Sequence, residues 1–215
     1  MLEHLLSLQH HQNIQAFKSV PLIDFHTHKP TAEGVVTPRC FGIHPWEAME
    51  EFQVSSFMVQ AEKVQTIGEC GLDKCCNTPW ERQMEVFVRQ IEIAEQLGKP
   101  LVIHCVKAFN ELMELRKTHK QTPWVVHGFT GSTELYNQLL KADIEVSFGA
   151  AILDKRREKV RETLSKADLN RIFLETDDSG ADIADIYHEA SSICGCDLSE
   201  LQTTIKDHYN ALMKR

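Results

Sequence analysis

Imidazole and carboxylate side chains recur at one kind of position in this chain of 215 residues, directly after short apolar runs. His26 and His28 are separated by one residue, a spacing that places both imidazoles on the same side of an extended strand. Imidazole and carboxylate groups together suit Zn, Mn, Fe or Ni ions, and one carboxylate can be shared by two ions. The residues of these types that follow apolar runs are His26, His28, Glu69, His104, His127 and Asp177. Six ligands exceed a four-coordinate structural site, so we expect two metal ions with open positions for water.

The apolar runs themselves predict strands. They are continuous rather than alternating, which is typical of parallel strands that are buried on both faces. Seven runs of this kind lie at residues 21–25, 40–43, 64–67, 100–103, 124–126, 144–148 and 171–174.

Helical patterns fill the gaps between these runs. In the clearest one, residues 79–98, a proline stands near the start, apolar residues recur at helical spacing and a glycine ends the pattern. Further helices are predicted at residues 107–118, 132–142, 155–166, 181–193 and 197–213. Strands that alternate with helices along a whole chain indicate a parallel α/β fold.

Chain length and strand number together predict a trimmed TIM-type (β/α) barrel. A full eight-stranded barrel takes about 250 residues, whereas this chain has 215 residues and seven clear strands. Only 15 residues separate His28 from His44, so the second βα unit is expected to be shortened, with 29–40 as a loop or short irregular strand. We expect one domain over 1–215, with an N-terminal extension at 1–20 that carries an extra helix.

The barrel explains why the candidate ligands should meet. All strands of a parallel barrel end on the same face, and active sites are built on that face. The six imidazole and carboxylate residues follow five separate strands, with His26 and His28 after the first, so they are expected to converge at one mouth.

Composition limits the classes of partner. The chain has 23 Lys+Arg against 31 Asp+Glu, a net charge of −8, so any contact with nucleic acid needs a local basic patch. The first 20 residues lack a basic stretch and a small-residue cleavage site, and no apolar run approaches about 18 residues. These features predict a cytoplasmic protein without membrane contact, and nothing in the sequence requires a protein partner.

Seven Cys without a CxxC pair argue against disulfides and against a cysteine-rich zinc site.

Six motifs give the chain a resemblance to the TatD-related metal-dependent hydrolases, of the amidohydrolase-like TIM-barrel group. They follow the family's order from residue 22 to about 180 and are together highly specific. The motifs are DFHTH at 24–28, GIHP at 42–45, GECGLD at 68–73, KPLVIH at 99–104, HGFTG at 127–131 and ETD at 175–177.

The resemblance implies a role for each candidate ligand. The residues that match the family's metal ligands are His26, His28, Glu69, His104, His127 and Asp177. Glu69 matches the residue that bridges two divalent ions, and Asp177 matches the catalytic aspartate that orients the attacking water. Members of the family are phosphodiesterases, typically deoxyribonucleases that trim DNA ends with Mg²⁺ or Mn²⁺, and Zn²⁺ also suits these ligand types.

The sequence departs from the family pattern at three places. The first and second motifs are closer together than usual. Val106, followed by Lys107, stands where the family usually has Arg, and lysine offers phosphate a point charge rather than a bidentate clamp. Asp178-Ser179 replaces the usual Ser-Pro and adds negative charge near the mouth.

Several residues near the strand ends are candidate substrate contacts. His44 either binds substrate or supports a ligand through a hydrogen bond. Lys107 and the basic group Lys155-Arg156-Arg157, with Arg156 and Arg157 as its chief members, could touch phosphates, although a solvated helix face is an equal alternative for the group. Trp46 either stacks on a base or packs over a loop.

The sequence therefore predicts a metal-dependent hydrolase whose substrate is a phosphodiester, in DNA or in a small molecule. Two ions would activate a water, and Asp177 would accept its proton. One alternative is a hydrolase of an amide, ester or lactone, since the same ions polarise a carbonyl, and the missing Arg at 106 and the added Asp178 favour it. The other is a non-catalytic metal-binding relative, which the complete ligand set opposes.

Overall fold

Parallel strands and helices alternate along residues 20–29, 31–49 and 51–214, the part of the chain that the computed structural model describes. The strands are β1 (Leu22–Ile23), β2 (Val35–Val36), β3 (Cys40–Phe41), β4 (Thr66–Asp73), β5 (Leu101–Val106), β6 (Trp124–Val126), β7 (Ile144–Phe148) and β8 (Ile172–Leu174). The helices are α2 (Val54–Ala61), α3 (Trp80–Leu97), α4 (Phe109–Thr118), α5 (Thr133–Lys141), α6 (Glu158–Ser165), α7 (Ile183–Cys194) and α8 (Leu198–Leu212).

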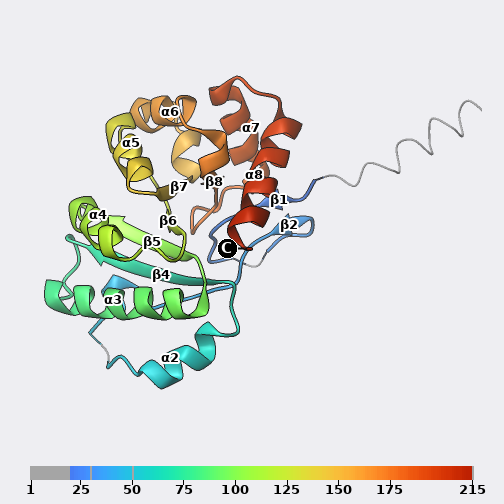
Figure 1. Cartoon of the computed structure of the whole chain (residues 1–215). Coiled ribbons are helices and arrows are strands. Elements are labelled where there is room, and N and C mark those ends of the chain that lie inside the picture. Colours follow the sequence, from blue (N-terminus) through green and yellow to red (C-terminus); the bar gives the residue numbers. More distant parts are fainter. Residues whose placement is uncertain (1–19, 30, 50, 215) are drawn as a thin grey trace, which may run out of the picture.

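A curled parallel sheet of six strands forms the centre of the fold (Figure 1). Its strands lie in sequence order from β3 to β8, and β1 and β2 form a separate parallel pair. The chain after β1 runs beside β8, where Phe25 N donates to Leu174 O at 3.0 Å and Asp177 N donates to His26 O at 2.9 Å. The predicted α/β fold, a trimmed TIM-type barrel, is confirmed, and each of the seven predicted runs overlaps a strand.

The shortened second unit is also confirmed. Among the described residues between β1 and β3, the regular structure is the two-residue strand β2, and no helix lies there. The extra helix predicted in the N-terminal extension lies outside the described residues. Helix α2 was not predicted, because it is short and buries little more than Phe57 and Ala61.

Helix α3 shows how the sequence pattern sets the packing. Its buried side chains include Val86, Phe87, Gln90 and Ile91, which recur at the spacing of one helix face. The helix ends at Gly98, whose φ of 63° is the left-handed conformation that favours glycine. The packing of α3 against β4 covers the strand that carries Glu69.

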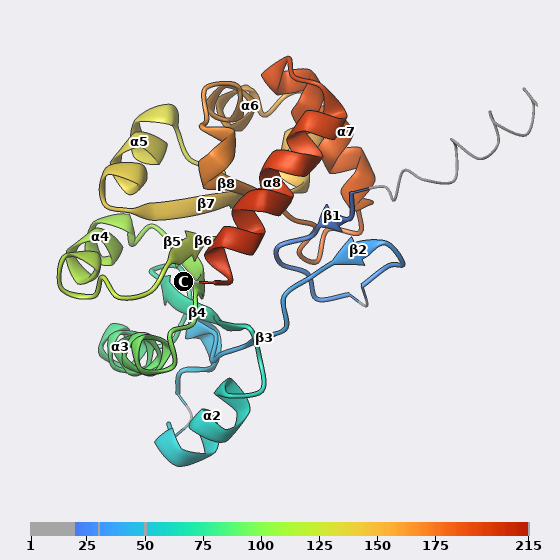
Figure 2. The same ribbon diagram turned by 45° about the vertical axis from the view of Figure 1, so that its right-hand side comes forward.

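Helix α8 lies across β1 and β8 (Figure 2). Its His208 places Nε2 at 2.6 Å from Oε2 of Glu145, near the start of β7. The other carboxylate oxygen of Glu145 accepts from Arg171 Nε at 2.9 Å. This buried carboxylate therefore ties α8 to the amino ends of the strands, opposite the ends that carry the candidate ligands.

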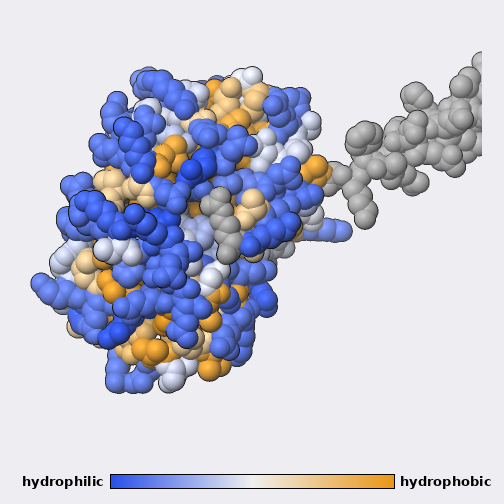
Figure 3. Space-filling view, viewed as in Figure 1, coloured by the Kyte–Doolittle hydropathy of each residue, from blue (hydrophilic) through white to orange (hydrophobic). Residues whose placement is uncertain are grey.

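The surface seen in Figure 3 is largely hydrophilic, with hydrophobic residues showing at the end where α2 lies in Figure 1. Large apolar side chains that are exposed in and around α2 include Met49, Val54 and Val59. Across the described residues, no helix has the length and apolar character required to cross a bilayer.

Candidate metal centre

Glu69 lies in β4 with its carboxylate directed at two groups of imidazoles. On one side, Oε2 is 3.2 Å from His26 Nε2 and 3.4 Å from His28 Nε2. Asp177 completes this side, since its Oδ1 is 3.8 Å from His26 Nε2 and 3.4 Å from His28 Nε2. Two imidazoles and two carboxylates thus surround one small space.

The other oxygen of Glu69, Oε1, faces the second group. His127 Nε2 lies 2.7 Å away, His104 Nδ1 lies 3.0 Å away and His44 Nε2 lies 3.2 Å away. Glu69 therefore stands between the two groups with one oxygen turned to each, the arrangement of a carboxylate shared by two ions.

Hydrogen bonds between the segments that follow β1 and β8 fix the group of side chains on the Oε2 side of Glu69. Asp24 is buried, and its carboxylate accepts two hydrogen bonds from Thr176. The backbone N of Thr176 donates one at 2.8 Å, and its hydroxyl donates the other at 2.7 Å. Thr27 Oγ1 donates to Asp177 O at 3.2 Å. Asp177 has a φ of 51°, in the left-handed region that aspartate and asparagine tolerate better than most residues. The polar contacts hold this bend and direct the Asp177 carboxylate toward the histidines.

His104 is oriented by a second carboxylate. Its Nε2 lies 3.3 Å from Asp73 Oδ2, while its Nδ1 faces Glu69. Because ionised Asp73 can only accept, the proton belongs on Nε2 and the lone pair on Nδ1 is directed into the site. Metal-binding histidines are commonly held in this way by a carboxylate.

His127 has a similar supporting contact. Its Nδ1 lies 3.4 Å from Oε1 of Glu175, a fully buried carboxylate. Glu175 is held in turn by Gly128 N, which donates to Oε1 at 2.6 Å, and by the hydroxyl of Ser147, which donates to Oε2. His127 therefore presents Nε2 to Glu69.

His44 differs from these two histidines. Its Nδ1 accepts a hydrogen bond from the backbone N of Trp46 at 3.3 Å, so the proton of the neutral ring belongs on Nε2. A protonated Nε2 donates and does not bind a metal. This geometry favours the predicted alternatives, a substrate contact or a supporting donor, over a ligand.

Charge in the site is balanced between carboxylates and imidazoles. Burial opposes ionisation of Glu69, but the surrounding imidazoles, His104 and His127 foremost, hold its pKa well below the usual range. Burial alone would lower the pKa of His127, but Glu175 and Glu69 raise it to about 10. Burial raises the pKa of Asp177. Asp177 is therefore a better proton acceptor than an ordinary surface aspartate.

The donor atoms fit divalent ions. Ligand bonds of about 2 to 2.2 Å with angles near 90 to 109° place donor atoms about 3 to 3.5 Å apart, and most distances between donor atoms in the site fall in this range. Three groups of donors lie close enough to hold an ion: His26, His28 and Glu69; His26, His127 and Asp177; and His44, Glu69 and His104. All six predicted ligands are thus brought together, and their role as ligands stays a prediction.

The cavity over these groups has a volume of about 420 Å³. Its lining comprises His28, Gly42, His44, Trp46, Glu47, Glu69, His104, His127, Asp177 and Asp178. Among the described residues of this lining there is no lysine or arginine. Lys107, Arg156 and Arg157 therefore do not line the cavity, and their contacts with substrate stay predictions.

One neighbour of the site, Asp73, was not predicted. Asp73 is 3% exposed and orients His104, and it accepts a hydrogen bond from Nε1 of the candidate Trp46 at 2.7 Å. The sequence carried a signal for Asp73, which ends the same motif as Glu69.

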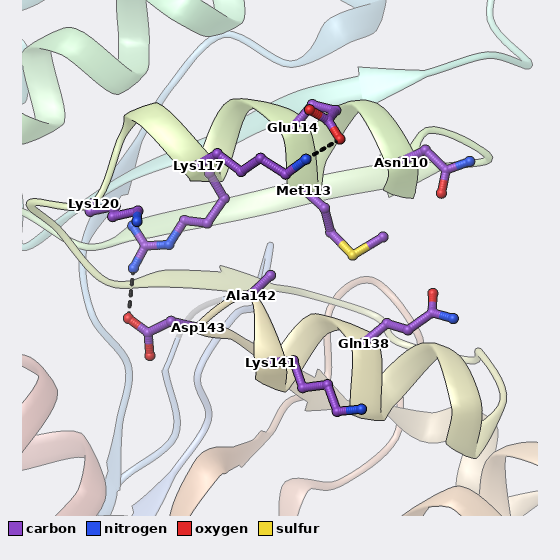
Figure 4. A pocket seen from close by; sticks show the side chains of 10 residues that line it. Asn110, Met113, Glu114, Lys117, Lys120, Gln138, Lys141, Ala142 and Asp143 are labelled. Carbon is purple, nitrogen blue, oxygen red and sulfur yellow. Dashed lines mark hydrogen bonds and ion pairs between the residues drawn. The ribbon is translucent and has the colours of Figure 1, made fainter.

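A second cavity, of about 640 Å³, lies between α4 and α5 and contains none of the candidate ligands (Figure 4). Lys117 pairs with Glu114 there at 2.6 Å, and Arg116 pairs with Asp143 at 2.9 Å. Lys120 and Lys141 also line it. This cavity is on the outer wall, between helices, and offers cations but no group of candidate ligands.

Comparison with known proteins places the site in a family context. The sequence model of one family, described as TatD related DNase, matches residues 23–185, a span that includes all six candidate ligands. The chain is 37% identical over 147 residues to the human 3'-5' RNA nuclease TATDN2, a match that covers 64% of this chain and 19% of that protein. It is 33% identical over 151 residues to the 3'-5' ssDNA/RNA exonuclease TatD of Escherichia coli K12, a match that covers 63% of this chain and 55% of that protein.

The fold has a solved counterpart. The crystal structure of YjjV, a TatD homologue from Escherichia coli K12, superposes with a TM-score of 0.74 at 22% identity and covers 86% of this chain and 79% of that chain. At this identity the likeness concerns the fold. The matched region spans about half the length of the bacterial nuclease and less of the human protein.

Proposed function

This chain belongs to the family of TatD-related DNases, and from that membership we propose that it is a metal-dependent phosphodiesterase that hydrolyses nucleic acid. The observation that carries the proposal is the position of Glu69, whose two oxygens face His26 and His28 on one side and His104 and His127 on the other. A shared carboxylate between two imidazole groups suits hydrolysis assisted by two metals.

The proposed cofactor is a pair of divalent ions, Mg²⁺ or Mn²⁺, with Zn²⁺ as the alternative. His26, His28 and Asp177 would hold one ion on the Oε2 side of Glu69. His104 and His127 would hold the other on the Oε1 side. When bound, such ions lower the pKa of water to near neutrality and offset charge on a phosphate.

The chain's own residues would supply the proton transfers. Asp177 would accept the proton of the attacking water, a role helped by the raised pKa of its carboxyl group. His44 would donate from Nε2 to a phosphate oxygen, because its Nδ1 is occupied by the backbone N–H of Trp46.

The proposed substrate is single-stranded DNA or RNA, cleaved from the 3' end. Relatives named 3'-5' RNA nuclease and 3'-5' ssDNA/RNA exonuclease support this choice over duplex DNA. Lys107, Arg156 and Arg157 would contact phosphates further along the strand. A cytoplasmic location, a single domain and the absence of an obligate protein partner remain predictions.

One observation favours the alternative, hydrolysis of a carbonyl compound. The described lining of the cavity includes the carboxylates Glu47 and Asp178 and no lysine or arginine, which disfavours an anionic substrate until the ions are bound.

A substrate panel separates the functions. Protein loaded with Mn²⁺ is assayed on a 5'-labelled single-stranded oligonucleotide, on bis(p-nitrophenyl) phosphate and on p-nitrophenyl acetate. We expect cleavage of the oligonucleotide from its 3' end and of the diester, both abolished by chelation. Turnover of the acetate alone would establish the carbonyl hydrolase, and no turnover with metal fully bound would establish a non-catalytic relative.

A further inference from the structure

Trp46 is an exposed aromatic residue at the mouth of the cavity over Glu69. It lies in the 3₁₀ turn Pro45–Glu47 and is 63% exposed, although large aromatic side chains are usually well buried. It lines the cavity together with five of the six candidate ligands, Asp177 among them. A large apolar surface at this position can take part in binding as well as in packing.

The ring is fixed in place despite its exposure. Its Nε1 donates to Asp73 Oδ2 at 2.7 Å, and Asp73 is held by Cys75 N, which donates to Oδ1 at 2.7 Å. The ring stands nearly perpendicular to His44, with centroids 4.8 Å apart and an interplanar angle of 87°. A surface that is already ordered loses less conformational entropy when a ligand binds to it.

We propose that Trp46 is a stacking site for a nucleobase of single-stranded nucleic acid, beside the phosphate that is cleaved. The proposal rests on the proposed function, and it names the part of the substrate that the site recognises. A tryptophan face stacks on any base, so it binds without sequence preference. A base inside a duplex is already stacked on its neighbours, so this residue favours single strands.

The residues that line the cavity support a contact with the base that is separate from the contacts with the phosphate. Since its described lining has no lysine or arginine, a phosphate inside this cavity would be bound by the metals and by His44. Lys29 and Arg39 lie outside it, in the lining of a neighbouring cavity of about 430 Å³ that shares His28 and Glu69. Selection of a nucleotide over a small phosphodiester then needs a contact with the base. A volume of about 420 Å³ is within the range of small-molecule pockets and has room for a nucleotide.

The test compares Trp46→Ala with Trp46→Phe. Both variants lose the hydrogen bond to Asp73, and only the phenylalanine keeps an aromatic face. Met49→Ala is the matched control, because Met49 is 61% exposed in the same segment and does not line the cavity. Each protein is assayed on a single-stranded oligonucleotide, on the same strand with an abasic 3'-terminal nucleotide, and on bis(p-nitrophenyl) phosphate.

For Trp46→Ala we expect the KM for the oligonucleotide to rise about 10- to 100-fold. The phenylalanine variant should recover most of this loss, and Met49→Ala should change nothing. Activity of the control Met49→Ala on the small diester should stay within about twofold of wild type. The abasic strand should bind wild type and Trp46→Ala equally, because the group that stacks is missing.

Fluorescence provides a readout that does not depend on catalysis. Oligonucleotide should quench the emission of wild-type protein, and the quenching should be lost in Trp46→Phe but kept in Trp80→Phe.

Distinct results would overturn the proposal. If wild type cleaves the oligonucleotide and Trp46→Ala cleaves it equally well, the stacking site is wrong while the nuclease function stands. An equal loss on the abasic strand would instead assign Trp46 to positioning His104 through Asp73. If wild type neither binds nor cleaves nucleic acid, the proposed function and the stacking site both fail.

Discussion

Glu69 owes its ionisation to its neighbours. A carboxylate so deeply placed in a site would ordinarily be neutral, yet five imidazole nitrogens lie within 3.4 Å of its oxygens and hold its pKa down. The imidazoles must lose their protons to bind an ion, so metal and protons compete for the same nitrogens. The ionised Glu69 carboxylate is therefore better suited to binding metal ions than to forming an isolated ion pair.

At Asp177 we expect Asp177→Asn to lower kcat on the oligonucleotide by about 10³-fold, within the usual range for a lost general base. Asparagine tolerates the left-handed backbone at this position, so the thermal unfolding midpoint should stay near that of wild type. Single-turnover kinetics at saturating Mn²⁺ provides the measurement. Asp178→Asn, at an exposed carboxylate that lines the same cavity, is the control and should keep near-normal turnover. Near-wild-type kcat in Asp177→Asn would assign the proton to another group.

The sequence was informative at this scale where residue type alone carried the chemistry. All six candidate ligands could be selected because each follows an apolar run in the sequence, and the structure brings the other five together around Glu69. The contact of Trp46 with Asp73 could not be predicted, because it depends on how the turn after β3 meets the end of β4. The same holds for His44, whose tautomer is set by one backbone N–H.

At the scale of elements, strands and long helices were predictable because burial repeats along them. The five buried residues of β7, for instance, are a continuous apolar or small run apart from Glu145. Helix α2 and strand β2 were not predicted with definite bounds, since both are short and depend on tertiary packing rather than on a repeating pattern.

Glu145 provides a test of how α8 is attached. We expect Glu145→Ala to lower the free energy of unfolding by about 3 kcal/mol, because it leaves His208 and Arg171 without their buried carboxylate. Urea unfolding should show a lower midpoint with an unchanged slope. Glu145→Gln keeps an acceptor for His208 and should lose less, and Glu92→Ala, on exposed α3 surface, should lose almost nothing. An unchanged midpoint in Glu145→Ala would mean that α8 is held by apolar packing alone.

At the scale of the whole molecule, a net charge of −8 opposes the approach of nucleic acid. Cations outside the cavity must then offset this repulsion. Arg156 is already paired with Asp154, through Nε at 2.9 Å and Nη2 at 3.0 Å, so Lys155 and Arg157 are the more available members of their group.

We expect the triple change Lys155→Ala, Arg156→Ala and Arg157→Ala to weaken binding of the oligonucleotide and to flatten its salt dependence. Each phosphate contact that is lost should remove about one unit from the slope of log K against log salt. Lys107→Ala should act in the same direction. The control is Lys120→Ala with Lys141→Ala, in the cavity between α4 and α5, which should leave the slope unchanged. Equal slopes in all variants would remove the cationic support for a nucleic-acid substrate and favour the carbonyl hydrolase.

The most direct test of the account is an anomalous difference map from a crystal of this protein soaked in Mn²⁺. We predict two peaks on opposite sides of Glu69, each about 2 to 2.3 Å from one of its oxygens. His26, His28 and Asp177 should ligate one peak, and His104 and His127 should ligate the other. A map with no peak in this cavity, or with peaks that do not touch Glu69, would contradict the account.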